Sequence, residues 1–333
     1  MVAATPTELL DAIRDAIEQS GASCMVAAAS RHPRQLVVIF PDSSRSLWVY
    51  IWNLTFGGRK SLQDEFRIQM TSVDSPLPLN PKGDTVLMGY HADLKVFAGF
   101  DLRRHRTFTA GSPSVQIEIS ALRDAVDQGL ALHRKANDEI AVGVGPEQFL
   151  AYVENAEELH SSGGDSAVFR LLRKATALKP IPASALNKLS GPRKRLVQTV
   201  SRLQRDSNFE RQVLGAYGHR CAVTRIQLRL LDAAHILPVA VPGSPDHVTN
   251  GIALSPTYHR AFDRGLIYLD RVDGDFHMRL NDAKLGELAS LHLEGGMETL
   301  SAALGKIHHP PDKGQWPSDD YVREANRHRK IGA

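Results

Sequence analysis

Two short stretches in the last third of the chain decide its fold. The first is Leu231-Asp-Ala-Ala-His235-Ile-Leu-Pro238. The second is Asn250-Gly-Ile-Ala-Leu-Ser-Pro-Thr-Tyr-His259-Arg-Ala-Phe-Asp263-Arg-Gly265. The first stretch predicts a strand that ends at its proline, and the Asn-Gly pair that opens the second is a turn signal before another strand. The serine and proline that follow suit the start of a helix, and the last glycine suits its end. The predicted order is strand, loop, strand and short helix.

This order brings a small set of reactive side chains together. His235 ends the first strand, His259 lies on the helix, and Asp263 follows four positions later on the same helical face. Hydrolysis of a phosphodiester needs a group that takes a proton from water and a cation that offsets the charge growing on the phosphate. A neutral imidazole and a hard divalent ion supply these two functions. The pattern therefore indicates a small hydrolytic metal site.

The series His235, Asn250 and His259, within Ala-Ala-His-Ile-x-Pro, Asn-Gly-Ile-x-Leu and His-x-x-Phe-Asp-x-Gly, resembles the HNH endonucleases with the ββα-metal fold. The similarity is closest to the branch found in bacterial restriction-type and phage-defence nucleases. The preceding Phe209-x-x-x-Val213-Leu-x-x-Tyr-Gly-x-x-Cys-Ala-Val-Thr also matches the helix and entry strand of that branch. The resemblance covers residues 207–270, about a fifth of the chain.

The resemblance implies a role for each motif residue. His235 would be the general base, Asn250 would orient the strand through backbone hydrogen bonds, and His259 would bind a divalent metal, Mg²⁺ or Mn²⁺. The chain departs from the family pattern just before the base, where many members carry a metal-binding aspartate and this chain has Ala234.

Two carboxylates are candidates to replace that missing ligand. Side chains alternate along a strand, so Asp232 points to the same side as Ala234 and is one candidate. Asp263 is the other, and the sequence leaves the choice open. Cys221 is expected to be a buried apolar residue rather than a metal ligand. The chain lacks the cysteine pairs that bind a structural zinc ion in some members of the family.

Charge is concentrated in the middle of the chain. Residues 165–229 contain 14 Lys and Arg against three acids, a net charge of +11, whereas the whole chain carries +3. Such a segment is typical of a contact with a polyanion, although a solvated helix face would explain it as well. Candidate phosphate-binding residues here and beside the motif are Arg193, Lys194, Arg195, Arg260 and Arg264.

The first half of the chain predicts a separate β-rich domain. A helix over 6–19 precedes β-prone runs at 36–40, 47–52, 66–71, 85–90, 94–100 and 115–119, and helical patterns follow at 121–132 and 147–159. These runs favour a twisted antiparallel sheet or small barrel. The expected fold class is α+β, with a β-rich domain over 1–160, a linker over 161–192, and an HNH nuclease domain with flanking helices over 193–333.

The β-rich domain is the candidate for selecting DNA. Trp48, Tyr50 and Trp52 share one face of a predicted strand. The sheet core is the favoured explanation of these aromatics, and stacking of Trp48 and Trp52 on a flipped base is the alternative. The Gly-rich basic loop over 56–60 fits either close approach to a phosphate or a plain hairpin tip.

Composition excludes several protein classes. The apolar runs fall far short of the ~20 residues of a membrane helix, and the N-terminus lacks a signal-peptide pattern, which predicts a soluble cytoplasmic protein without a membrane partner. Two cysteines nearly 200 positions apart give no disulfide framework.

The leading hypothesis is a restriction-type, metal-dependent endonuclease of phage defence that acts on double-stranded DNA, with the first domain selecting the DNA, either modified or unmodified. The alternatives are a defence nuclease activated by a nucleotide signal and a DNA-binding regulator that does not cleave. A homodimer is expected if both strands are cut, because one site cuts one strand.

Overall fold

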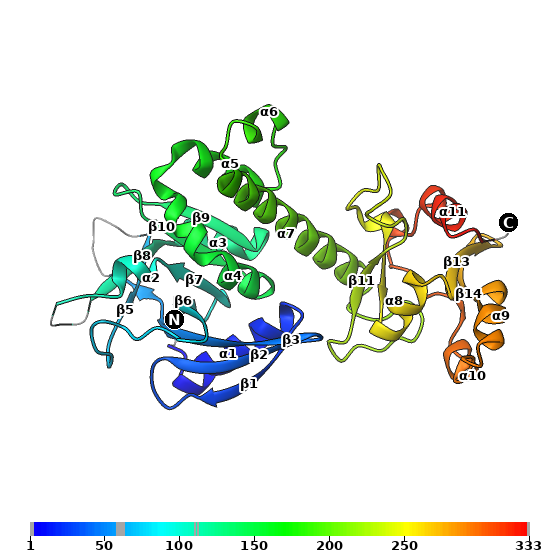
Figure 1. Cartoon of the computed structure of the whole chain (residues 1–333), viewed down its shortest axis with the longest axis horizontal. Helices are drawn as coiled ribbons and strands as arrows, with labels where there is room; N and C mark the ends of the chain where they lie inside the picture. Colours follow the sequence, from blue (N-terminus) through cyan, green and yellow to red (C-terminus); the bar gives the residue numbers. More distant parts are fainter. Residues whose placement is uncertain (1–2, 58–63, 110, 112, 332–333) are drawn as a thin grey trace. The chain divides into compact units, whose positions relative to one another are not determined.

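The computed structural model describes residues 3–57, 64–109, 111 and 113–331 (Figure 1). The chain divides into two compact units, Met1–Ser207 and Asn208–Ala333. Residues 58–60 of the Gly-rich basic loop lie outside the described residues.

This division differs from the expected boundaries. The segment 161–192, which the sequence assigned to a linker, contains α5 (Ser166–Thr176) and the start of α7 (Gly191–Ala216). The buried Val168 and Leu172 of α5 lie in the core of the first unit. Pro, Ala and Gly surround these helices, and that composition concealed an apolar face at helical spacing. The second unit accordingly begins at Asn208 rather than at 193.

A seven-stranded sheet forms the centre of the first unit, in the order β1-β2-β3-β6-β7-β10-β9. Its β3 and β6 are parallel, and its other neighbours are antiparallel. In chain order the strands are β1 (Ser23–Ala28), β2 (Arg34–Phe40), β3 (Ser43–Asn53), β6 (Gly83–His91), β7 (Val96–Phe100), β9 (Leu130–Arg134) and β10 (Ile140–Val144). A second sheet contains β4 (Thr55–Phe56), β5 (Glu65–Gln69) and β8 (Ser114–Glu118).

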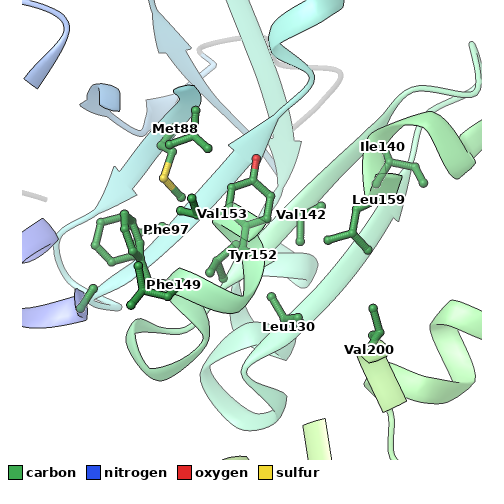
Figure 2. Packing of buried hydrophobic residues seen from close by; sticks show 14 of the residues in the cluster. Met88, Phe97, Leu130, Ile140, Val142, Phe149, Tyr152, Val153, Leu159 and Val200 are labelled. Carbon is green, nitrogen blue, oxygen red and sulfur yellow. The ribbon is translucent and has the colours of Figure 1, made fainter. Parts of the chain in front are cut away.

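Both faces of the large sheet are covered. On one face, apolar side chains of the central strands pack with helices α1 (Pro6–Gln19), α4 (Phe149–Ser161), α5 and α7. Figure 2 shows part of this core, in which Phe97, Phe149 and Tyr152 lie together. On the other face, Tyr50 and Trp52 of β3 pack with the small sheet and with α3 (Ile119–Gln128). The short α2 (Leu102–His105) and α6 (Ala183–Leu186) complete the unit.

The expected fold class is confirmed, because a sheet-rich first unit precedes a mixed α and β second unit. The helix over 6–19 has the predicted bounds. The helix predicted over 121–132 instead ends at Gln128, where Gly129 has a φ of 84°. The sequence then continues as two strands, β9 and β10, that were not predicted.

The second unit begins with the end of α7 and then forms the predicted strand, loop, strand and helix. These are β11 (Asp232–His235), the turn η3 (Val248–Asn250), β12 (Gly251–Leu254) and α8 (Pro256–Asp263). A three-stranded sheet and three helices follow: β13 (Ile267–Val272), β14 (Asp275–Leu280), α9 (Asp282–Ser290), α10 (Met297–Ser301), β15 (Gly305–Lys306) and α11 (Asp319–His328). No helix of the described residues is long and apolar enough to cross a membrane.

Candidate functional site

The ββα segment is built as its sequence predicts. β11 and β12 are antiparallel, with Asp232 opposite Leu254 and His235 opposite Gly251. A side chain at position 251 would approach Val213 of α7 to 2.2 Å, so only glycine lets α7 pack this closely. Gly265 follows α8 with a φ of 68°, the left-handed conformation that ends a helix.

His235 is held at the end of β11 by two neighbours. The ring of Phe209, on α7, stacks on it with centroids 3.8 Å apart and planes 13° from parallel. Nε2 of His235 lies 3.0 Å from Oδ1 of Asp246, in the loop between β11 and η3. The His235 side chain is 19% exposed. Within the described part of the chain its Nδ1 has no hydrogen-bond partner, so this nitrogen is available to another molecule.

Asn250 ties the loop to the strand end. It is fully buried. Its Oδ1 accepts a hydrogen bond from the backbone N–H of Leu237 at 2.8 Å, and its Nδ2 donates to the carbonyl of the same residue at 3.3 Å. Nδ2 also donates to the carbonyl of Pro245 and to the hydroxyl of Ser244. The Asn250 side chain thus bonds to the backbone just after His235, at Leu237, and to the backbone just before Asp246, at Pro245.

His259 lies between the two candidate carboxylates. Its Nδ1 is 2.9 Å from Oδ2 of Asp232, and its Nε2 is 3.3 Å from Oδ2 of Asp263. The hydrogen bond to Asp232 raises the pKa of His259; burial opposes this and the charge of Asp263 reinforces it. Because the two ring nitrogens point in opposite directions, Asp232 and Asp263 approach different atoms of the ring.

The donor atoms suit a hard divalent cation, since carboxylate oxygens and imidazole nitrogens both ligate Mg²⁺ and Mn²⁺. Asp232 and His259 place two possible donor atoms, Oδ2 and Nδ1, 2.9 Å apart, and both could ligate one ion once the proton between them has left. Asp263 approaches the opposite nitrogen, and its side chain is 59% exposed. In the described residues no group of three or more His, Cys, Asp or Glu side chains converges to hold a metal ion.

The basic candidates fall into two groups. Arg260 on α8 and Arg264 directly after it are exposed, and neither has an ion pair or side-chain hydrogen bond in the part of the chain that the structure describes. At the start of α7, Arg193 pairs with Asp165, and Lys194 donates to the side chain of Asn187. The first group therefore lies free beside the site, whereas two of the three α7 residues already have partners in the first unit.

The tryptophan candidates differ in exposure. Trp52 is 8% exposed, its Nε1 donates to the carbonyl of Thr71, and the ring of His32 stacks on it at 4.2 Å. This burial agrees with the sheet-core explanation and leaves no ring face of Trp52 open to a base. Trp48 is half-buried.

Three residues near the site were not identified as functional from the sequence. Asp246 lies 11 positions from His235 in a loop without periodicity, and Phe209 served only as part of a motif. Arg329, at the end of α11, donates to the carbonyl of Ile236 at 3.1 Å and lies 4.3 Å from the ring centre of Phe262. Burial lowers the pKa of Arg329. No spacing in the sequence links a residue so close to the C-terminus with β11.

Comparisons with known proteins find two matching families and a similar solved structure. Residues 221–270 match the family described as HNH endonuclease, which confirms the resemblance seen in the sequence. Residues 45–153 match the family described as Methylase-associated X1. A solved structure, "Modification dependent TagI restriction endonuclease", is similar at 13% identity over 86% of this chain and 81% of that chain, with a TM-score of 0.30. No curated protein matches the sequence.

Proposed function

Because residues 221–270 form an HNH endonuclease domain, we propose that the protein is a restriction-type nuclease that cuts double-stranded DNA with His235 as its general base. The observation that carries this proposal is the state of the His235 ring. One nitrogen is engaged by the protein, and the other has no partner among the described residues. An imidazole held in this way can take a proton from water at a fixed position.

The chemistry uses His235 at one atom. Nδ1 takes a proton from a water molecule, the hydroxide oxygen forms a bond to phosphorus, and the bond from phosphorus to the 3′ oxygen breaks. Asp232 and His259 would hold a divalent cation, which when bound neutralises charge on the phosphate and the leaving oxygen. Arg260 and Arg264 supply further positive charge for the flanking phosphates.

The position of the site supports access to a DNA strand. β11 pairs only with β12 in its sheet, so within the described residues its other edge has no partner strand. By strand alternation, His235 and Asp232 lie on opposite faces of β11, each beside a different helix. A phosphate placed along the open edge would meet the base from one face and the cation ligands from the other.

We assign DNA selection to the first unit. The name of the family matched by residues 45–153 refers to methylases, and this supports a substrate whose bases are modified. The half-buried Trp48 remains a candidate for a base contact, and Trp52 is assigned to the core. A homodimer would allow both strands to be cut.

Digestion of matched DNA substrates tests the function. Purified protein with Mg²⁺ or Mn²⁺ is incubated with unmodified, 5-methylcytosine, hydroxymethylated and glucosylated DNA. Cleavage without any added nucleotide is expected, with a preference among the four substrates. Cleavage that needs a nucleotide ligand would favour the signal-activated nuclease, and binding without cleavage would favour the regulator. Linearisation that rises with the square of enzyme concentration would support the dimer.

A metal titration tests the ligand assignment. His259→Ala and Asp232→Asn should each raise the Mg²⁺ or Mn²⁺ concentration needed for half-maximal cleavage by about 10-fold or more, since each removes one of few protein ligands. Asp263→Asn should change it less, because Asp263 approaches the other ring nitrogen. An unchanged titration in the first two variants would contradict the assignment.

A further inference from the structure

The loop between β11 and η3 carries one carboxylate that meets the proposed base. We propose that Asp246 is the positioning residue of His235 and fixes its ring in the tautomer that leaves Nδ1 free to accept a proton. This inference rests on the proposed function for its catalytic consequence, whereas the contact itself stands on the geometry of the second unit.

The contact determines which nitrogen carries the proton. An ionised carboxylate only accepts hydrogen bonds, so Nε2 of His235, 3.0 Å from Oδ1 of Asp246, must be the donor. In a neutral ring the lone pair then lies on Nδ1. The stacked ring of Phe209 restricts rotation of the imidazole, since a turn about χ2 would break the overlap of two nearly parallel planes.

Asp246 is itself held in place. Its neighbours Ser244 and Pro245 both bond to the buried amide of Asn250, which also clasps Leu237. The Ser244 hydroxyl donates to the carbonyl of Leu237 at 2.7 Å, which is a second link between this part of the loop and the residues that directly follow β11. One buried side chain therefore sets the distance between the strand that carries the base and the loop that carries its partner.

The carboxylate also acts when the proton moves. Water gives a proton to Nδ1 while its oxygen bonds to phosphorus, and the bond from phosphorus to the 3′ oxygen breaks so that this oxygen leaves with the electron pair. The ring becomes an imidazolium with Nε2 still bonded to Asp246. Nothing is transferred to Asp246, which stays ionised and offsets the new positive charge. The Asp246 side chain is 26% exposed, so water screens this attraction only in part.

Kinetics of four variants separate this role from a structural one. Asp246→Asn and Asp246→Ala should lower kcat about 100-fold and change the KM for DNA less than 2-fold, because positioning affects the chemical step. His235→Ala combined with Asp246→Ala should be no slower than His235→Ala alone, since Asp246 acts through the ring. The control is Asp275→Asn, which removes a carboxylate bonded to Lys306 on β15 and should retain full activity.

Nitrogen NMR on ¹⁵N-histidine protein gives a readout independent of cleavage. Wild type should show His235 protonated at Nε2, and the Asp246 variants should show a mixture of tautomers, with melting temperatures close to that of wild type. Equal tautomer populations in wild type and both variants, an unchanged kcat, or a further rate loss in the double variant would overturn the proposal. If His235→Ala cuts DNA at the wild-type rate, the proposed base is wrong, and the tautomer spectra still decide whether Asp246 holds the ring.

Discussion

A buried histidine of the first unit and the proposed base of the second unit are held in different ways. In the first unit His160 is 6% exposed, and both ring nitrogens are bonded, Nε2 to the hydroxyl of Tyr152 and Nδ1 to the carbonyl of Ile140. In the second unit His235 keeps one nitrogen without a partner among the described residues. A fully bonded imidazole stabilises a fold, and one with a free nitrogen can react. Between these two histidines, the second ring nitrogen separates a structural role from the proposed role as a base.

Replacing His235 or His160 by alanine tests this comparison, and it has the largest expected effect on cleavage rate of the variants considered. His235→Ala should slow cleavage about 1,000-fold, equivalent to about 4 kcal/mol of activation free energy, and leave the free energy of unfolding nearly unchanged. His160→Ala should lower the free energy of unfolding by about 3 kcal/mol, because it leaves Tyr152 and Ile140 without partners in the core. Its cleavage rate should remain near wild type below the melting temperature. Cleavage assays and urea denaturation measure both, and the opposite pattern would refute the comparison.

Buried amides allow a second test. Asn250 in the second unit and Gln204 in the first are both buried and bond to backbone from separate segments. Either change to alanine should cost about 3 kcal/mol of stability, because several buried polar groups lose partners. Only Asn250→Ala should also abolish most cleavage at temperatures where it is folded, since it frees the loop that faces His235. Equal activity of the two variants would show that the loop position does not matter.

Much of this arrangement could be predicted from the sequence, and the reason is local. The spacing of His235, Asn250 and His259 is fixed by one hairpin and one short helix, so periodicity and turn signals place all three. The contacts of Asp246 depend on a loop of 15 residues between His235 and Gly251, which has no period to read. Arg329 reaches Ile236, the residue after β11, only through tertiary packing.

The first unit was harder to predict for a related reason. β10 is buried throughout, so its sequence Ile-Ala-Val-Gly-Val does not alternate and resembles part of a helix. Trp52 lies on the same strand face as Tyr50, as the sequence predicts. The alternation of side chains along a strand does not tell whether that face is covered by other elements or exposed to solvent. His32, which covers Trp52, precedes β2 and is distant in sequence.

A carboxylate of the first unit predicts a pH dependence of stability. Glu139 is 4% exposed; burial raises its pKa, but hydrogen bonds from His105 and Lys135 outweigh this and lower it from 4.5 to about 2. The unfolded chain therefore binds a proton at higher pH than the folded chain. The resulting stabilisation is complete above about pH 4.5 and is lost as the pH falls toward 2.

Glu139→Gln should accordingly cost about 2 to 3 kcal/mol of unfolding free energy at pH 7 and much less near pH 3. Urea denaturation followed by tryptophan fluorescence measures this in a Trp316→Phe background, where the remaining tryptophans, Trp48 and Trp52, both report on the first unit. A cost independent of pH would show that the carboxylate charge contributes nothing. Cleavage at pH 7 should be unaffected in the folded fraction.

The smallest expected effect concerns which basic residues of the two units meet DNA. Affinity for duplex DNA falls with salt by a slope of about 0.9 for each phosphate contact. Replacing Arg260 and Arg264 together by alanine should make the slope shallower by about two units, because both are free beside the site. The α7 triple variant, in which alanine replaces Arg193, Lys194 and Arg195, should lose about one unit at most. Arg193 and Lys194 already bond to Asp165 and Asn187.

Binding to DNA measured from 50 to 300 mM salt, with Ca²⁺ in place of Mg²⁺ to prevent cleavage, gives both slopes. If the slope of the α7 variant falls by about three units, DNA displaces the partners of Arg193 and Lys194. The basic segment of the first unit then binds the DNA phosphates, as its charge suggested. No change in the Arg260 and Arg264 variant would move the phosphate path away from α8, and the open edge of β11 would then no longer be the place where the strand lies.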